Sequence, residues 1–288
     1  MTFATPESLP LTNLDPVTSE VLLAPPRPLY RRDAPRWLGL TRRTLVPLLL
    51  LAAWAFGSRY GYIADNILAS PAEVLDSGRQ LLLSGVLWHH LSISLVRAAL
   101  GLALGGVVGL VLGATAGLTR LGDELIDPTI QMLRAIPFLA LVPLLIIWFG
   151  IGEASKVLLI AMAAGKPMYL NAYGGVRSVD PKLVEVGRVF GLSRRALITG
   201  IYLPAALPSI LVGLRLAMTL ALIALIAVEV INTAQGIGFL MLQAQEFFRT
   251  EIIVVCMLVY ALFGLFSDLL VRGLERVLLP WNYARRGR

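Results

Sequence analysis

The sequence predicts an all-α integral membrane protein with six transmembrane helices. Of its 288 residues, 57% are hydrophobic and only 15% are charged. A soluble domain would carry about 25% charged residues, so this deficit excludes a soluble globular class. Six apolar runs separated by charged stretches indicate the spans, because a helix of about 20 apolar residues crosses the hydrocarbon core of a bilayer.

The first 43 residues contain seven prolines and no sustained apolar run. Such a composition is typical of a disordered segment, so we expect residues 1–43 to form a cytoplasmic tail. The first apolar run begins near Leu45 without a small-residue cleavage site, and we therefore expect no cleavable signal peptide. The six-helix membrane domain is expected at 44–282, followed by a basic cytoplasmic C-terminus at 283–288.

The first expected span, 44–58, is short, with 15 uncharged residues, whereas the second, 98–119, has 22. Between them the chain becomes amphipathic from Pro71 onward, which fits a helix lying on the outer membrane surface. The remaining spans are expected at 135–152, 157–176, 206–231 and 252–271.

The distribution of positive charge predicts the orientation. Arginine and lysine gather in the tail, in the loops after the second and fourth spans and at the C-terminus, while the opposite loops hold few. Cytoplasmic loops carry this excess in membrane proteins. We therefore expect both termini in the cytoplasm.

Glycines recur every four residues along the second span. This spacing places them in one stripe on a helix, where a second helix can approach closely, as tight packing in lipid requires. We interpret the stripe as a helix-packing surface and not as a binding site. Its members are Gly101, Gly105, Gly109, Gly113 and Gly117.

The sequence contains no enzyme motif. The pair Gly165-Lys166 is followed by Pro167 and lacks the upstream glycine of a P-loop. The single cysteine, Cys256, lies in an apolar run, so no cysteine metal site is expected within the chain. The net charge of +7 comes from short clusters between apolar runs, which argues against nucleic acid. We expect neither catalysis nor a cofactor bound by this chain.

A few polar side chains fall within the expected spans, where charge is costly. Lys166 could attract an anionic substrate, pair with Glu229 or extend toward the membrane surface. Glu229 fits a helix-packing hydrogen bond as well as a place on a substrate pathway. Asn171 and Tyr173 could line such a pathway or bond a neighbouring helix.

The loop at 180–205 is charged, and we expect it to contain two short helices. Asp180 is placed to cap the first helix, and Pro181 fits its first position. Gly191 ends this helix, and Ser193 can cap a second one that stops at Leu203-Pro204. A cytosolic helix pair of this kind is suited to docking into a groove on a soluble partner, although an ordinary amphipathic loop would have the same shape.

This loop resembles the EAA loop of the permeases of ABC importers. Glu185, Gly191 and Leu203-Pro204 match that pattern, whereas Val186 and Gly187 replace its two alanines. Further stretches, among them IQMLRAIPFLALVPLLIIWFGIGEASK, LPSILVGLRLAM and GIGFLMLQAQEFFRTEIIVV, resemble the aliphatic-sulfonate, taurine, nitrate and bicarbonate branch of this family, and most of all its sulfonate permeases.

The resemblance implies the type I importer permease fold, in the inner membrane of a bacterium. It implies a homodimer with two cytosolic ATPase subunits, which hold the ATP and Mg²⁺, and an extracytoplasmic solute-binding protein. The loop would be the coupling helix that fits a cleft in the ATPase. The residues to which the resemblance gives this role are Glu185, Gly187, Arg188, Gly191, Leu192 and Ser193.

The substrate implied by the resemblance is a small oxyanion, with an aliphatic sulfonate as the first hypothesis and nitrate, taurine or bicarbonate as alternatives. A secondary transporter or channel acting alone is the alternative from another class. That alternative predicts inverted repeats with paired broken helices, a pattern that the sequence does not show, and it gives the loop at 180–205 no partner.

Overall fold

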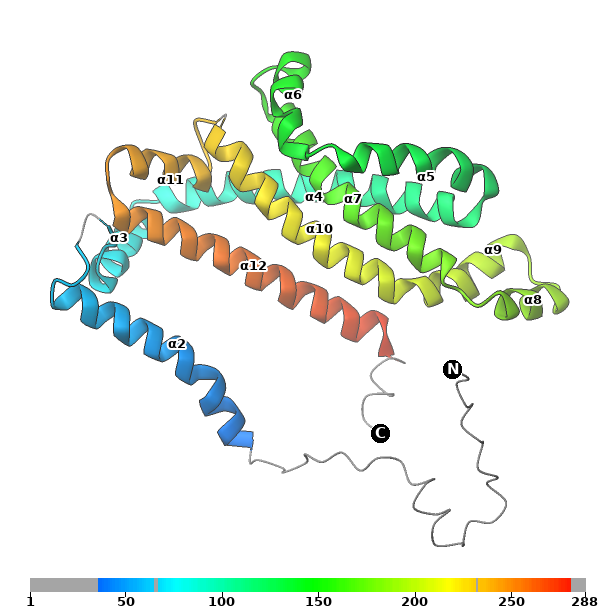
Figure 1. The fold of residues 1–288 in the computed structure, drawn as a ribbon, viewed down its shortest axis with the longest axis horizontal. Coiled ribbons are helices and arrows are strands. Elements are labelled where there is room, and N and C mark those ends of the chain that lie inside the picture. The colour runs from blue at the N-terminus through cyan, green and yellow to red at the C-terminus, as the bar shows by residue number, and fades with distance from the viewer. Residues whose placement is uncertain (1–35, 65–66, 232, 281–288) are drawn as a thin grey trace, which may run out of the picture. The chain divides into compact units, whose positions relative to one another are not determined.

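The computed structural model describes residues 36–64, 67–231 and 233–280, with side chains from Leu45 onward. All regular elements in these ranges are helices (Figure 1). The chain divides into two compact units between Ala53 and Trp54. Most of the expected tail and the whole expected C-terminus lie outside the described residues.

Helix α2 (Arg36–Arg59) begins within the stretch that we expected to be tail. Tryptophan, leucine and arginine follow Pro35 in the sequence, and these residues tolerate a helix well. In the first unit, the side chains from Leu45 to Leu51 include large apolar groups that are more than half exposed. Such exposure is what a helix surrounded by lipid would show, since lipid is as apolar as leucine.

The core of the second unit is a set of three long helices, α4 (Val86–Leu118), α7 (Glu153–Arg177) and α10 (Leu203–Ile231). Helix α7 packs against both α4 and α10, as Figure 1 shows for the middle of the unit. The contact between α7 and α10 includes several small residues, among them Ala163, Ala164, Ala217 and Ala221, all buried. Small side chains allow the helix backbones to approach, so packing in lipid gains from dispersion contacts.

At one end of the core, three further helices enclose an apolar cluster. They are α3 (Pro71–Leu83), α11 (Ile237–Glu246) and α12 (Thr250–Leu278). Cys256 is completely buried in this cluster, beside Ile237 and Val255. Helix α12 then runs alongside α10 (Figure 1).

The expected third span, 135–152, is not one helix. Helix α5 (Arg120–Ala135) is followed by a 3-10 turn (Phe138–Leu141) and α6 (Val142–Phe149), and the two parts are bent by 87°. The break falls at Pro137, which lacks an N–H, and Ile136 before it is extended, as residues before proline prefer to be. Gly150, with a φ of +74°, then ends α6.

Three helical stretches of the described chain are long and apolar enough to cross a membrane: α4, the stretch Arg194–Ile231, and α12. The bent pair would make a fourth, and Leu45–Arg59 is a shorter apolar helix. Helix α7 contains Glu153, Lys156 and Lys166, which lower its hydropathy. Length and composition therefore support a membrane protein. By these two properties alone, the described residues contain three or four membrane-spanning helices, against the six expected.

Candidate functional site

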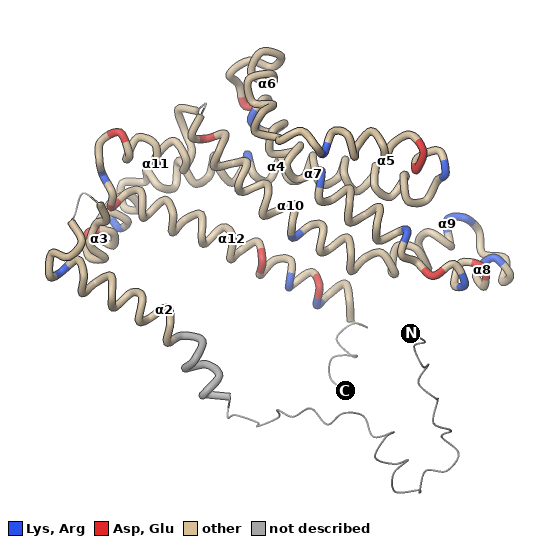
Figure 2. Tube along the Cα trace, in the orientation of Figure 1, with Lys and Arg blue, Asp and Glu red and all other residues tan. Residues whose placement is uncertain are grey.

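The charged loop lies at one end of the second unit, opposite α11 (Figure 1). Its first helix, α8 (Pro181–Val189), begins where the sequence predicts, because the Asp180 carboxylate accepts a hydrogen bond of 2.9 Å from the Lys182 backbone N–H and Pro181 occupies the first turn. Figure 2 shows lysine and arginine gathered along α8 and α9 (Arg194–Leu197). Helix α8 thus has a fixed start and lies among positively charged residues.

The reversal after α8 depends on glycine. Gly191 has a φ of +74°, a conformation that other residues adopt only at a cost, and the N–H of Leu192 donates to the Gly187 carbonyl at 3.0 Å. Ser193 then accepts from the Ala196 N–H and caps α9, as predicted. A Cβ on Gly187 would lie 2.7 Å from the Leu197 side chain, so the lack of a side chain there lets the two short helices pack closely.

One face of this helix pair is apolar and exposed. Val189 and Phe190 are more than 80% exposed, and Leu183 and Val186 are more than half exposed. Beside them lies a cavity of about 670 Å³ that Gly187, Leu192 and the start of α10 help to line. Glu185 and Arg188 are exposed on the same helix. Exposed aromatic and aliphatic groups next to a hollow are typical of a protein–protein contact surface.

The expected stop at Leu203-Pro204 is absent. Helix α9 continues through a π-helical turn (Ile198–Tyr202) into α10, so Arg194–Ile231 forms one helical stretch of 38 residues. A π turn rearranges the backbone hydrogen bonds just before Pro204, and this accommodates a residue without an N–H. The loop and the long helix are therefore connected directly.

The other end of α10 contains a buried ionic cluster. Glu229 is completely buried, and its carboxylate accepts hydrogen bonds from Ser94 at 2.6 Å, from the Gly238 N–H at 2.9 Å and from Arg97 at 3.0 Å. Tyr260 on α12 lies 3.3 Å from the same carboxylate. These partners account for the burial of Glu229 and make it a connector of helices α4, α10, α11 and α12.

Arg97 joins this cluster to α7. Its Nε and Nη2 each donate to the Glu153 carboxylate at 2.6 Å, and Nη1 also donates to the Gln235 carbonyl at 2.7 Å. Lys156 pairs with the same Glu153 at 3.0 Å. Glu153 is the first residue of α7, ahead of the expected span 157–176. Its hydrogen bond with Arg97 is the main cause that lowers its pKa to about 2.

Gly236, directly before α11, packs against the ionic cluster. Gly236 has a φ of +119°, and a Cβ there would collide with the Glu229 carboxylate. Its N–H donates to His90 Nδ1 at 3.0 Å, while the next N–H, of Ile237, donates to Ser94 at 2.9 Å. The sequence interpretation missed Ser94 and Arg97, although their spacing of three residues on a helix was a signal that they share a face.

The other candidate pathway residues are held by partners of their own. Lys166 does not pair with Glu229; its Nζ donates to the Ile136 carbonyl at 2.7 Å, at the break between α5 and the 3-10 turn. Asn171 donates to the Pro167 carbonyl one turn earlier. Tyr173 donates to Asp123 on α5 at 2.5 Å. Four candidates expected along one pathway are thus distributed over separate contacts in this conformation.

A second tyrosine repeats the contact of Tyr173. Tyr169 donates to Asp127 at 2.9 Å, and the two tyrosine rings are stacked with centroids 6.0 Å apart. The two tyrosines are four residues apart on α7, and the two aspartates are four residues apart on α5. The helices are therefore joined by two neighbouring hydrogen bonds. Asp123 also pairs with Arg177 at 3.4 Å.

The glycine stripe of α4 faces α7. A Cβ on Gly101 would lie 2.5 Å from Ile160, and one on Gly113 would lie 2.5 Å from the Tyr169 carbonyl. The same holds at Gly117, whose added Cβ would be 2.8 Å from Val176. At Gly105 and Gly109 the added carbon would collide with the backbone of α7. The absence of side chains along the stripe is what permits the close contact of these helices.

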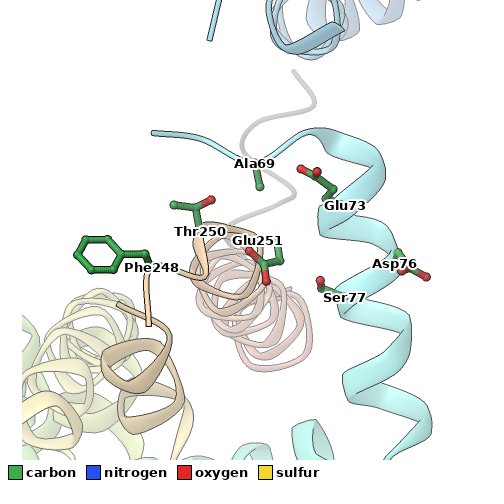
Figure 3. A pocket seen from close by; sticks show the side chains of 7 residues that line it. All are labelled: Ala69, Glu73, Asp76, Ser77, Phe248, Thr250 and Glu251. Carbon is green, nitrogen blue, oxygen red and sulfur yellow. The ribbon is translucent and has the colours of Figure 1, made fainter. Parts of the chain in front are cut away.

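An acidic hollow of about 470 Å³ lies between α3 and the start of α12 (Figure 3). Glu73 and Asp76 come from α3 and Glu251 from α12. Glu73 forms a capping box with Ser70, and Glu251 pairs with Arg249 at 3.1 Å. Within the described ranges, no three histidine, cysteine or acidic side chains are grouped as a metal site would require.

The model of the family described as "Binding-protein-dependent transport system inner membrane component" matches residues 105–279. The chain is 43% identical to the aliphatic sulfonates transport permease protein SsuC of Escherichia coli, over 86% of this chain and 95% of that one. It is 38% identical to SsuC of Bacillus subtilis over 97% of each chain. The taurine transport system permease protein TauC of E. coli is 35% identical, over 81% of this chain and 87% of that one.

A solved structure supports the same fold. The chain resembles a crystal structure of an amino acid ABC transporter with histidines, with a TM-score of 0.57 and 19% identity, over 69% of this chain and 96% of that one. The regular elements among this chain's described residues are all helices, several of them long and apolar, which agrees with this likeness. The chain belongs to the family of inner-membrane components of binding-protein-dependent transport systems and is the permease subunit of an ABC importer.

Proposed function

We propose that this permease forms a six-span homodimer with both termini in the cytoplasm, bound by two cytosolic ATPase subunits. Two further spans beyond the apolar stretches would be the apolar part of α2, Leu45–Arg59, and residues 157–176 of α7. The apolar part of α2 is short, but its large aliphatic side chains up to Leu51 are more than half exposed. In α7, Tyr169 and Tyr173 are paired with α5. The positive loop at α8 and α9 supports a cytoplasmic location for that end.

We further propose that α8 is the coupling helix, with Glu185, Gly187, Arg188, Gly191, Leu192 and Ser193 as its functional residues. The single observation that carries this is the exposed apolar face of α8 beside a cavity, held in shape by the Gly191 turn. Such a face would be unfavourable in water without a partner. ATP-driven closure of the ATPase pair would move α8 and change which side of the membrane is open.

The proposed substrate class is the aliphatic sulfonates, delivered by an extracytoplasmic solute-binding protein. The identities of 43% and 38% to relatives that carry this name, against 35% to a relative named for taurine, support this choice. Nitrate and bicarbonate remain alternatives from the resemblance alone. ATP and Mg²⁺ would be held by the ATPase subunits, and this chain would contribute no catalytic residue.

The test combines co-purification with transport. The chain is expressed with an ATPase and a binding protein of the sulfonate branch, and the complex is placed in proteoliposomes. We expect the ATPase to co-purify, and uptake of ethanesulfonate to require both ATP and the binding protein. Glu185→Lys should lower the amount of bound ATPase, whereas Glu246→Lys, a matched reversal at the opposite end of the unit, should leave it unchanged.

Two outcomes would contradict the importer or its coupling helix, and a third would contradict its proposed substrate. Sulfonate uptake that continues without any ATPase would identify a transporter that acts alone. Full ATPase recovery and full uptake in Glu185→Lys would remove α8 from the coupling role. Uptake of taurine or nitrate in place of ethanesulfonate would retain the importer and change its substrate.

A further inference from the structure

A cavity of about 640 Å³ lies against the middle of the membrane domain, between α4, the bent pair α5–α6 and α7. Its volume is within the range of small-molecule pockets, about 300 to 1,000 Å³. Aliphatic side chains form nearly all of its wall, including Val108, Leu112 and Leu144, with Trp148 at one side. Such a surface favours an alkyl chain over a hydrated ion, because polar groups lose their water there without gaining partners.

The charged groups that line this cavity are both cations, Lys166 and Arg134. The Lys166 ammonium uses one of its three N–H donors on the Ile136 carbonyl. Within the described ranges, Arg134 has neither a hydrogen bond nor an ion pair. The two side chains thus leave donors for an anion at the edge of an apolar cavity.

We propose that this cavity is the site at which the permease holds its substrate, an alkyl chain bearing one anionic oxyacid head. The chain would lie along the wall formed by Val108 and Leu112, and the head would accept hydrogen bonds from Lys166 and Arg134. This inference rests on the proposed sulfonate import and sharpens it. An inorganic oxyanion such as nitrate or bicarbonate has no part that could use the apolar wall.

The geometry also predicts how chain length affects transport. Each added methylene buries more apolar area in the cavity until the wall is filled. A larger side chain at Val108 would take that space and would exclude long chains before short ones. Val107 provides a matched control, because it is the preceding residue of α4, is also largely exposed and does not line the cavity.

The experiment measures ATP-dependent uptake of ethanesulfonate and hexanesulfonate by the complete complex in proteoliposomes. We expect Val108→Phe to lower hexanesulfonate uptake at least about fivefold more than ethanesulfonate uptake, and Val107→Phe to change neither. Lys166→Met should lower uptake of both about tenfold, the effect of losing one charge-assisted hydrogen bond. Lys166→Arg should retain most activity. Arg134→Gln should also lower uptake of both, whereas Arg120→Gln, at an exposed cation of the same helix, should retain full uptake.

The outcomes of this experiment distinguish a failure of this inference from a failure of the proposed function. If the wild-type complex imports no sulfonate, the proposed function fails first. If it imports both sulfonates and the Val108 and Lys166 variants behave like their controls, the cavity is not the substrate site, although the importer stands. Loss of a co-purifying anionic phospholipid in Lys166→Met with normal uptake would identify a lipid site. Efficient crosslinking of two copies through Val108→Cys would show that a second chain fills the cavity. Either result overturns the inference.

Discussion

Replacing Arg97 by leucine should be among the most damaging single changes in this permease. Arg97 is 3% exposed, and its guanidinium connects the completely buried Glu229 carboxylate to Glu153 and to the Gln235 carbonyl. Leucine keeps much of the apolar volume and removes every donor. The Glu229 charge would then remain completely buried without a cationic partner.

The magnitude follows from what each variant leaves behind. Removing one partner of a buried ion pair costs about 3 to 5 kcal/mol, because the other charge remains uncompensated. Glu229→Leu should cost less than Arg97→Leu, since Arg97 keeps its two bonds to Glu153 and the one to Gln235. The double variant Arg97→Leu/Glu229→Leu leaves no buried carboxylate without a partner. Its loss should be smaller than the sum of the two single losses by about 2 kcal/mol.

The free energy of unfolding can be measured in mixed micelles by titration with SDS, with helix content as the signal. We expect the order of stability to be wild type, Glu229→Leu, then Arg97→Leu. Arg215→Leu is a suitable comparison, because that arginine pairs with Glu275 at 3.0 Å while remaining 39% exposed. A loss below about 1 kcal/mol for Arg97→Leu, or strict additivity in the double variant, would refute the reasoning from burial.

The remaining predictions concern packing, coupling and pH. Gly109→Ala should destabilise the protein by roughly 1 to 3 kcal/mol, the usual cost of overpacking, whereas Gly106→Ala, where an added Cβ meets nothing within 4 Å, should be near neutral in the same titration. Gly191→Val should strain the +74° turn by about 1 to 2 kcal/mol and abolish ATP-dependent uptake, while immunoblots show a normal amount in the membrane. The ion pair of Glu153 with Arg97 should contribute fully to the free energy of unfolding above the ordinary carboxylate pKa, and this contribution should fall only as the pH drops toward 2. A smaller destabilisation by Arg97→Leu at pH 5 than at pH 8 would contradict this.

Local features of the loop could be predicted from the sequence because they depend on neighbouring residues. Asp180 and Ser193 cap their helices as expected, Pro181 occupies the first turn of α8, and Gly191 adopts the positive φ that a glycine after a helix indicates. The apolar runs likewise predicted the all-helical membrane class. Such features depend on contacts within about four residues, which a sequence displays directly.

Contacts between distant residues could not be predicted in the same way. Arg97 and Glu229 are 132 residues apart, and nothing in either segment identifies the other as its partner. The break at Pro137 was hidden because the run 135–152 is uniformly apolar, so composition alone favoured one span. The continuation through Pro204 was missed for a different reason: the rule that proline stops a helix has an exception where a π turn rearranges the hydrogen bonds.

The helical stretch Arg194–Ile231 begins beside the proposed coupling helix and ends two residues after Glu229. Its 38 residues correspond to roughly 57 Å at about 1.5 Å per residue. A rod of this length works as a lever: a tilt of about 10° around its midpoint carries each end by about 5 Å, close to the pitch of one helical turn. A displacement at the proposed coupling helix could thus be transmitted along this continuous helical stretch, its π turn included, to the ionic cluster at the far end.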